Sequence, residues 1–380
     1  VIKWLENIIS ESRNYPLIRR NRLYLGLFFS SVAQAELDKI LDNKEPALTV
    51  AHKSGMKDSL GMCLNMIGQV YFRKGEWQNA ITWHLKVVDL RYHVHTRSME
   101  DCFTALTISF ALLGKYERSL EKINELEIYT RELSNHHKIF LWSCKIRYYM
   151  LLKDKSEVRN LLAQFESYFL HLVFWIDIPE INYTKALVFE GSENNLLKAE
   201  HELENIIQTA TLQHNRIHLL ELFAIQALCF DKQGRSDEAQ EALIRSIEIS
   251  EKGGIIGFYI ELGDPILQLI QKMPENFKNK PVVINIIQGY NDLLALQKEL
   301  PSKEGGRTKM EQINALTPTE IIVLKWVAKG LRNQEIAEKI FVSEDTVKKH
   351  IYHMFQKLHV KNRLSLVEGA REEGILVDEA

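Results

Sequence analysis

The sequence predicts an all-α fold in which a long array of helical hairpins is followed by a small helical head. Glycine and proline, which break helices, number 18 and 8 among 380 residues, or about 7% against roughly 12% in average globular proteins. Apolar residues recur at helical spacing along most of the chain. With 46% hydrophobic residues, a chain of this length is expected to bury a sizeable core, divided between two or three domains.

The composition also indicates where the protein works. The longest nearly uncharged apolar stretch, Leu23 to Ala35, is shorter than the roughly 20 residues that cross a bilayer, and no signal peptide is evident. We therefore expect a cytoplasmic protein with no membrane partner. The chain opens at Val1 rather than Met, which is compatible with a fragment or trimmed product of a longer protein. The cysteines stand too far apart for a CxxC site and are expected to be reduced and buried: Cys63, Cys102, Cys144 and Cys229.

Charge is unevenly distributed along the chain. The whole chain carries −2, but residues 314–371 hold ten Lys or Arg and six Asp or Glu, a formal charge of +4. A small basic segment on an acidic body predicts a nucleic-acid-binding domain carried by a part that does not bind nucleic acid. The polar run before it contains Pro301, Gly305 and Gly306 and is expected to be a linker. The predicted domains are a helical-repeat domain at 1–300, a linker at 301–313 and the head at 314–380.

One nearly complete hairpin pattern lies in Gly61–Asp89. It places a small residue where two helices touch (Gly68), an aromatic residue one turn later (Tyr71), a turn glycine (Gly75) and a small residue on the second helix (Ala80). This order resembles a tetratricopeptide repeat. The pattern recurs more loosely at Leu106, Phe110, Gly114, Ser119 and Ile123, and at Ala227, Phe230, Gly234, Ala239 and Leu243.

The predicted turns between paired helices lie about 40 positions apart, at Gly75, Gly114, Lys153/Asp154, Gly191 and Gly234. This spacing exceeds the roughly 34 residues of the standard repeat, so the units are expected to be divergent, with longer helices. Such hairpins stack into a superhelix whose concave side offers an extended binding surface. We therefore predict a sensor or docking module whose groove holds an effector or partner protein of unknown identity.

Nothing in this region indicates catalysis. Gly114-Lys115 lacks the following Ser or Thr of a phosphate loop, and the common dinucleotide, hydrolase and metalloprotease motifs do not occur. His136-His137 and the pair His93 and His95 lack the spacing of a metal site. We expect no enzyme activity, cofactor or metal. Aromatic residues at helical spacings are expected to form the core between helices rather than a ligand box: Trp77, Trp83, Tyr148, Tyr149, Phe169, Phe174 and Trp175.

The segment 237–270 carries a second resemblance. Its alanines and leucines at helical steps, followed by Phe258-Tyr-Ile-Glu-Leu and the Gly263-Asp264-Pro265 break, resemble the final repeat and exit segment of the MalT-like large regulators. In those proteins an ATP-hydrolysing module precedes a helical superhelix and a DNA-binding end. No ATPase motif is present here, so the resemblance implies either the C-terminal part of such a protein or a shorter relative.

The head is the most informative segment. Thr317-Pro318-Thr319-Glu320 forms a capping box that predicts a helix start, and Gly330 is placed to end that helix in a left-handed conformation. Asn333 is expected to cap a second helix and Ser343 a third. The expected inward residues are Ile321, Leu324, Val327 and Ala328 in the first helix, Ile336, Ala337 and Ile340 in the second, and Val347, Ile351, Met354, Phe355 and Leu358 in the third. Three capped helices with a tight turn between the last two predict a helix-turn-helix.

The outer face of the third helix is the candidate DNA-contacting surface. Lys348, Lys349, Tyr352 and Gln356 share the face opposite the apolar stripe. A major groove admits one α-helix, where Lys can donate to guanine or phosphate and Tyr and Gln can supply hydrogen bonds. On charge alone, a solvated face of an ordinary helix is the better explanation of these residues.

The whole string from Leu316 to Arg363 resembles, without a gap, the LuxR-type DNA-binding domain of bacterial regulators. It includes Leu316-Thr-Pro-Thr-Glu, Asn333-Gln-Glu-Ile-Ala and Val342-Ser-Glu-Asp-Thr-Val-Lys348. The resemblance implies a four-helix domain with a fourth helix, starting at Asn362-Arg363, that usually mediates dimerisation. It departs from the family at Thr319, where Arg is usual, and at Tyr352, which is often basic. The helix face and the resemblance together predict these DNA-binding residues: Ser343, Thr346, Lys348, Lys349, Tyr352, Gln356, Asn362 and Arg363.

Together these features predict a sequence-specific transcriptional regulator that binds double-stranded DNA as a homodimer under control of its helical-repeat domain. Two alternatives remain open at this point. One is a protein-interaction scaffold whose helix-turn-helix no longer contacts DNA. The other is the regulatory C-terminal part of a larger ATP-dependent signalling switch.

Overall fold

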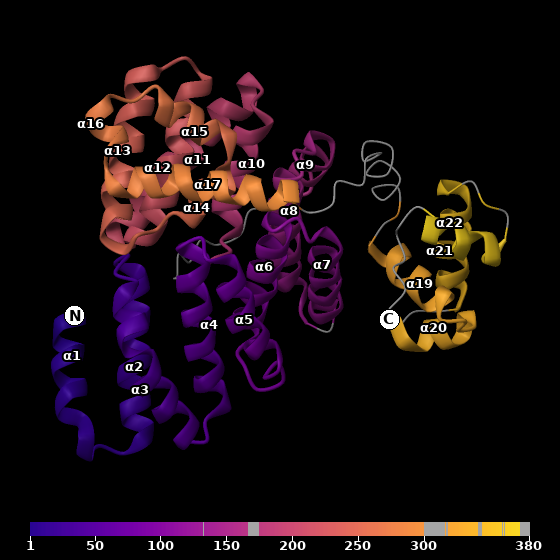
Figure 1. The fold of residues 1–380 in the computed structure, drawn as a ribbon, viewed down its shortest axis with the longest axis horizontal. Coiled ribbons are helices and arrows are strands. Elements are labelled where there is room, and N and C mark those ends of the chain that lie inside the picture. The colour runs from indigo at the N-terminus through magenta and orange to yellow at the C-terminus, as the bar shows by residue number, and fades with distance from the viewer. Residues whose placement is uncertain are drawn as a thin grey trace. The chain divides into compact units, whose positions relative to one another are not determined.

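The computed structural model describes residues 1–131, 133–165, 175–299, 316, 318–340, 344–358, 360 and 362–372. The chain divides into two compact units, Val1–Gln297 and Lys298–Ala380, which are described separately (Figure 1). Within the described residues the chain forms helices and no strand, as the shortage of glycine and proline predicted. No helix in these ranges combines the length and apolarity needed to span a membrane.

The first unit is a succession of antiparallel helices, drawn from indigo to orange in Figure 1. They are α1 (Ile2–Glu11), η1 (Ser12–Asn14), α2 (Leu17–Ala33), α3 (Asp38–Lys53), α4 (Lys57–Arg73), α5 (Trp77–Val88), α6 (Thr96–Leu112), α7 (Tyr116–Arg131), η2 (Asn135–His137), α8 (Lys138–Leu151), α9 (Lys155–Leu162), α10 (Pro179–Glu190), α11 (Glu193–Leu212), α12 (Arg216–Lys232), α13 (Ser236–Gly253), α14 (Gly257–Leu262), α15 (Asp264–Gln271), α16 (Glu275–Lys278) and α17 (Pro281–Glu299).

The turns inside the hairpins lie where the sequence predicted them. Gly75, Gly114, Gly191 and Gly234 have φ values of +76°, +68°, +81° and +77°, and Lys153 has +57°. A helix that reverses direction commonly places a left-handed residue after its last turn, and glycine adopts that conformation without a Cβ penalty. The sequence missed one further hairpin, α2 to α3, because its left-handed residue is Ala35 (φ +59°).

Small residues allow the paired helices to approach, as at Gly68 on α4. A Cβ at this position would lie 2.8 Å from the imidazole of His84 on α5, and Ala80 on the same helix is fully buried. The core around them contains the predicted aromatic residues Trp77, Tyr148 and Trp175, with Trp83 and Tyr149 half-buried against it. Phe169 and Phe174 lie outside the described residues. All four cysteines are buried with free thiols, as predicted.

The late helices of this unit return to the early ones. The amide of Ile256, which precedes α14, donates to the carbonyl of Arg73 at the end of α4 over 3.1 Å. The side-chain amide of Gln34 donates to the carbonyl of His214 over 3.0 Å. Gly257 packs so closely on the Phe72 carbonyl that a Cβ has no room there. Helices late in the unit therefore contact helices early in it, in addition to the contacts between hairpins that are neighbours in the chain.

The second unit contains α19 (Pro318–Ala328), α20 (Asn333–Ile340), α21 (Glu344–Lys357) and α22 (Arg363–Glu372). Gly330 ends α19 with φ +81°, as predicted. The core contains Leu316, Val323, Leu324, Val327, Ile336, Ala337, Val347, Ile351, Met354, Leu366 and Ala370, with Phe355 and Leu358 packed against it.

Two details of this unit differ from the prediction. Val323 is fully buried although it was not assigned to the apolar stripe of α19, whereas Ala328 is only half-buried. Asn333 does not cap α20 but is its first residue. The backbone amide of Arg332 instead donates to the carboxylate of Glu335 over 2.7 Å. The predicted caps Thr317 and Ser343 lie outside the described residues, as do the side chains of Ile321 and Ile340.

Candidate functional site

The outward face of α21 is the candidate nucleic-acid interface. Val347, Ile351 and Met354 are at most 7% exposed, and their spacing places one side of the helix in the core. Lys348 and Tyr352, which lie one turn apart on another side of the helix, therefore face outward. Lys348 has a side chain that is 55% exposed, and Tyr352 is 60% exposed. The exposure of Lys348 and Tyr352 agrees with their predicted place opposite the apolar stripe.

The ammonium group of Lys348 forms an ion pair within α21. The Nζ atom of Lys348 lies 3.1 Å from Oε1 of Glu344, one turn earlier, and both side chains are about half exposed. Pairs of this kind contribute about 0.3–0.5 kcal/mol in water. The pair is therefore weak enough for the ammonium to exchange Glu344 for a phosphate or a base edge.

For several other predicted DNA-contacting residues, the structure describes the backbone but not the side chain. Thr346, Lys349 and Gln356 lie on α21, where the structure describes their backbone alone, and Ser343 lies outside the described residues. Asn362 and Arg363 are described. The Oδ1 atom of Asn362 accepts from the Ser365 amide over 2.8 Å, so Asn362 caps α22 where the fourth helix was expected.

Arg363 has an internal structural role. Its guanidinium donates to Oδ1 of Asn333 over 2.8 Å and also to the carbonyl of Leu331. Desolvation in this half-buried position lowers the pKa of Arg363. The arginine thus fastens the start of α22 to the start of α20, a contact that the sequence analysis did not foresee. Direct contact of Arg363 with DNA stays a prediction.

Comparison with known proteins covers the segment that forms α19 to α22. Residues 314–370 match the family of bacterial regulatory proteins named after LuxR. These residues form a LuxR-type helix-turn-helix domain. The chain is also homologous to the transcriptional regulator MalT of Klebsiella pneumoniae, with 22% identity over 287 residues, covering 68% of this chain and 30% of that relative.

Further relatives match the LuxR-type domain. The uncharacterized transcriptional regulatory protein YxjL of Bacillus subtilis is 44% identical over 66 residues, which cover 17% of this chain and 30% of the relative. The nitrate/nitrite response regulator NarL of Escherichia coli is 38% identical over 68 residues, covering 18% and 32%. The chain spans about a third or less of each of these relatives.

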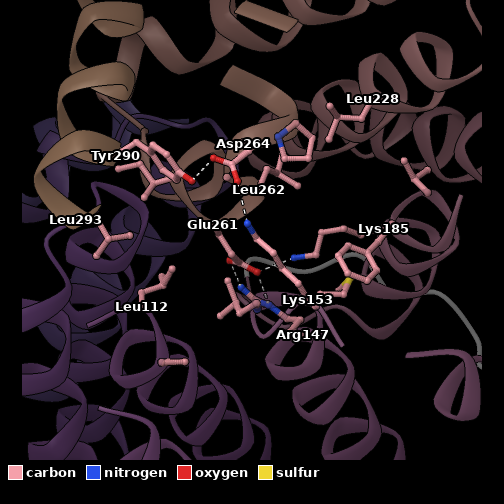
Figure 2. A pocket seen from close by; sticks show the side chains of 18 of the residues that line it. Leu112, Arg147, Lys153, Lys185, Leu228, Glu261, Leu262, Asp264, Tyr290 and Leu293 are labelled. Carbon is pink, nitrogen blue, oxygen red and sulfur yellow. Dashed lines mark hydrogen bonds and ion pairs between the residues drawn. The ribbon is translucent and has the colours of Figure 1, made fainter. Parts of the chain in front are cut away.

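Outside the LuxR-type domain, the first unit, Val1–Gln297, contains a pocket of about 510 Å³ (Figure 2). This unit is called the helical-repeat unit below. Its walls come from α6, α8, α10, α12, α14, α15 and α17, together with the first residues of α7 and α9 and the turns beside them. The sequence predicted a binding surface on the concave side of the repeats but named no residues for it, and the residues of this pocket are scattered between Ala111 and Gln297. Five cationic and two acidic side chains line the pocket, giving a formal charge of +3.

A buried charge cluster forms one wall. The carboxylate of Glu261 accepts from Nη2 of Arg147 over 2.6 Å and from Nζ of Lys185 over 2.6 Å (Figure 2). Burial acts to raise the pKa of this carboxyl, but the two cations outweigh it and lower the pKa to about 2. Glu261 is therefore ionised, and Nη1 of Arg147 also lies 3.9 Å from Oδ1 of Asp177.

A second acid lies at the edge of the pocket. Asp264 receives a hydrogen bond from the hydroxyl of Tyr290 over 2.6 Å and pairs with Nζ of Lys153 over 2.8 Å. Figure 2 shows these three side chains meeting from α15, α17 and the turn before α9. Asp264 thus ties α17 to the rest of the pocket.

Proposed function

We propose that the chain is a transcription regulator that binds specific double-stranded DNA sequences through the outward face of α21, under control of its helical-repeat unit. The observation that carries this proposal is the exposed stripe of Lys348 and Tyr352 on the third helix of a LuxR-type domain. A helix of this length fits a major groove, and lysine and tyrosine can donate to base edges and phosphates. Ser343, Thr346, Lys349 and Gln356 are proposed to extend the interface.

We further propose that two LuxR-type domains pair through α22 to occupy two half-sites. One head with a formal charge of +4 neutralises few phosphates and would bind weakly at physiological salt. A second, linked head raises the effective concentration at the adjacent half-site. Leu364 on α22 supports this arrangement, because a leucine that is 70% exposed offers an apolar contact for a second copy.

The repeat unit is proposed to be the regulatory part of the same molecule, consistent with its homology to MalT. The proposed boundaries are 1–300 for this part, 301–313 for the linker and 314–380 for the DNA-binding part. This role implies a cytoplasmic protein without enzyme activity of its own.

The test is selection of binding sites from a random duplex library with the intact chain, followed by affinity measurement on the selected site. The double variant K348E/K349E should bind that site about 100-fold or more weakly, because two phosphate or base contacts become repulsive. The matched control is K53E/K252E, which makes the same charge change on α3 and α13 and should bind normally. Equal binding by K348E/K349E would remove α21 as the DNA-contacting helix. Failure to recover any sequence motif would favour the scaffold alternative.

A further inference from the structure

Two lysines of the pocket lie at the end of α10. Nζ of Lys155 donates to the carbonyl of Glu190 and Nζ of Lys232 to the carbonyl of Phe189, each over 3.3 Å. The two lysines come from different hairpins, at the start of α9 and the end of α12. Their ammonium groups therefore bind consecutive carbonyls beside the left-handed turn at Gly191, where a Cβ would lie 3.0 Å from Nζ of Lys232.

These two ammonium groups lack carboxylate partners among the described residues. Glu261 is shared by Arg147 and Lys185, and Asp264 is bound by Lys153 and Tyr290. The carboxylate of Glu190 is occupied by Arg159, by the amide of Ser192 and by Asn195.

The positive charge of the two lysines is only partly compensated by Glu190. Desolvation and then the neighbouring charge of Lys155 lower the pKa of Lys232, whereas the charge of the Glu190 carboxylate acts to raise it. Each ammonium has three donors and uses one on a carbonyl, so two remain on each. An anion placed between Lys155 and Lys232 would compensate the repulsion and take up these donors.

The rest of the pocket is mostly apolar. Its side walls include Leu112, Val188, Ile225, Leu228 and Leu293. A cavity of about 510 Å³ falls in the range of pockets that hold small organic molecules. The guanidinium of Arg147 is already bound by the Glu261 carboxylate. The ammonium groups of Lys155 and Lys232 are therefore the cations that can bind an anionic ligand. This combination fits a molecule with an apolar body and a single anionic end.

We propose that this pocket binds a small amphipathic organic anion, with its carboxylate or phosphate between Lys155 and Lys232 and its apolar body along the leucine-lined wall. Such a ligand also touches α17, which supplies Tyr290, Leu293 and Gln297 to the pocket. Gln297 donates to the carbonyl of Leu112 over 2.7 Å. Because α17 is the last helix of the repeat unit, ligand occupancy stabilises the helix from which the chain continues to the LuxR-type domain. The regulatory consequence rests on the proposed function, but the binding does not.

The test uses the intact chain and three eight-carbon probes: octanoate, octyl phosphate and the neutral octan-1-ol. Calorimetric titration should show at least one of the two anions binding, and about tenfold or more tighter than octanol. The double variant K155Q/K232Q should weaken anion binding about tenfold or more and leave octanol unchanged. The matched control K53Q/K252Q removes two lysines on α3 and α13 and should bind as the parent does. Hydrogen exchange in residues 281–297 should slow when the tighter anion is bound.

Every outcome decides the proposal. Preference for octyl phosphate or for octanoate identifies the anionic group, and either supports the site. Octanol binding as tightly as both anions, undiminished anion binding by K155Q/K232Q, or no binding of either anion overturns it. Unchanged exchange in α17 with bound anion overturns the proposed coupling. None of these measurements uses DNA, so failure of the LuxR-type domain to bind DNA would leave the ligand result standing.

Discussion

Arg363 at the start of α22 donates to Oδ1 of Asn333 at the start of α20 over 2.8 Å, and also to the Leu331 carbonyl. The fourth helix of the LuxR-type domain is thereby fixed to the first turn of its helix-turn-helix. Any partner that pairs with α22 would act on an element joined directly to the DNA-contacting part.

Replacing Arg363 with Met should destabilise this junction by about 1–2 kcal/mol, because two partly buried acceptors lose a charged donor. Hydrogen exchange in α20 and α22 of the intact chain should accelerate, while exchange in the repeat unit should not change. R363K is the matched control for charge, and it should recover only part of the protection because one ammonium does not reproduce the guanidinium fork. Unaltered exchange in α22 of R363M would show that apolar packing alone holds the helix.

Removing Glu344 should tighten DNA binding. In E344Q, Lys348 loses its 3.1 Å partner, and a negative charge leaves the face proposed to meet phosphate. We expect about two- to fivefold tighter binding to a selected site, with stronger dependence on salt. The same change should cost about 0.3–1 kcal/mol of helix stability, since an acid in the first turn favours the helix dipole. Weaker DNA binding by E344Q at unchanged stability would indicate that Glu344 contacts a base instead.

Leu364 should control pairing of the heads. Replacing this 70% exposed leucine with Asp places a charge in the proposed contact between two α22 helices, which should shift sedimentation towards the monomer. Binding to a DNA site with two half-sites should weaken more than binding to a single half-site. L197D on α11, where the parent leucine is 59% exposed, is the control for a surface charge. Equal sedimentation of L364D and the parent would place dimerisation elsewhere.

Several parts of this structure were predictable because local chemistry determines them. The turns at Gly75, Gly114, Gly191 and Gly234 follow from glycine's access to positive φ. The hairpin at Ala35 was missed because an alanine in the same conformation carries no such signal. Asn333 was interpreted as a cap from its residue type, but its side chain accepts from an arginine 30 positions away. Contacts of that kind depend on how the helices pack.

The pocket was less accessible to sequence reasoning for the same reason. Lys155 and Lys232 look like solvated lysines on separate helices. Only the stacking of their hairpins brings both ammonium groups to consecutive carbonyls of α10. The buried cluster of Arg147, Lys185 and Glu261 likewise joins residues that are up to 114 positions apart. Helix periodicity indicates which face is buried but not which distant charge it meets.

The contact between α4 and α5 should not tolerate a methyl group at Gly68. In G68A, the new Cβ would lie 2.8 Å from the His84 ring, so the helices must separate, at a cost of about 1–3 kcal/mol. G26A on α2 is the matched control, because its Cβ would lie 3.7 Å from Leu5 in ordinary contact. That change should be neutral or stabilising by up to about 1 kcal/mol from helix propensity. Urea unfolding of both variants measures the difference, and equal stability would show that His84 moves at no cost.

Glu100 should make the repeat unit less stable as pH rises. Its fully buried carboxyl lies 2.5 Å from Nδ1 of His137, and burial is the main cause that raises its pKa to about 8 from an ordinary value of 4.5. The folded state therefore keeps a proton that the unfolded state releases. The resulting stabilisation is complete below about pH 4.5 and is lost progressively up to about pH 8, by about 2–4 kcal/mol. In E100Q the amide stays neutral and can donate to His137, so this loss is absent.

Urea unfolding at pH 5 and pH 8 measures the difference. The free energy of unfolding of E100Q should rise relative to that of the parent as the pH increases. A difference between the two proteins that does not change with pH would mean that Glu100 is ionised in the folded chain.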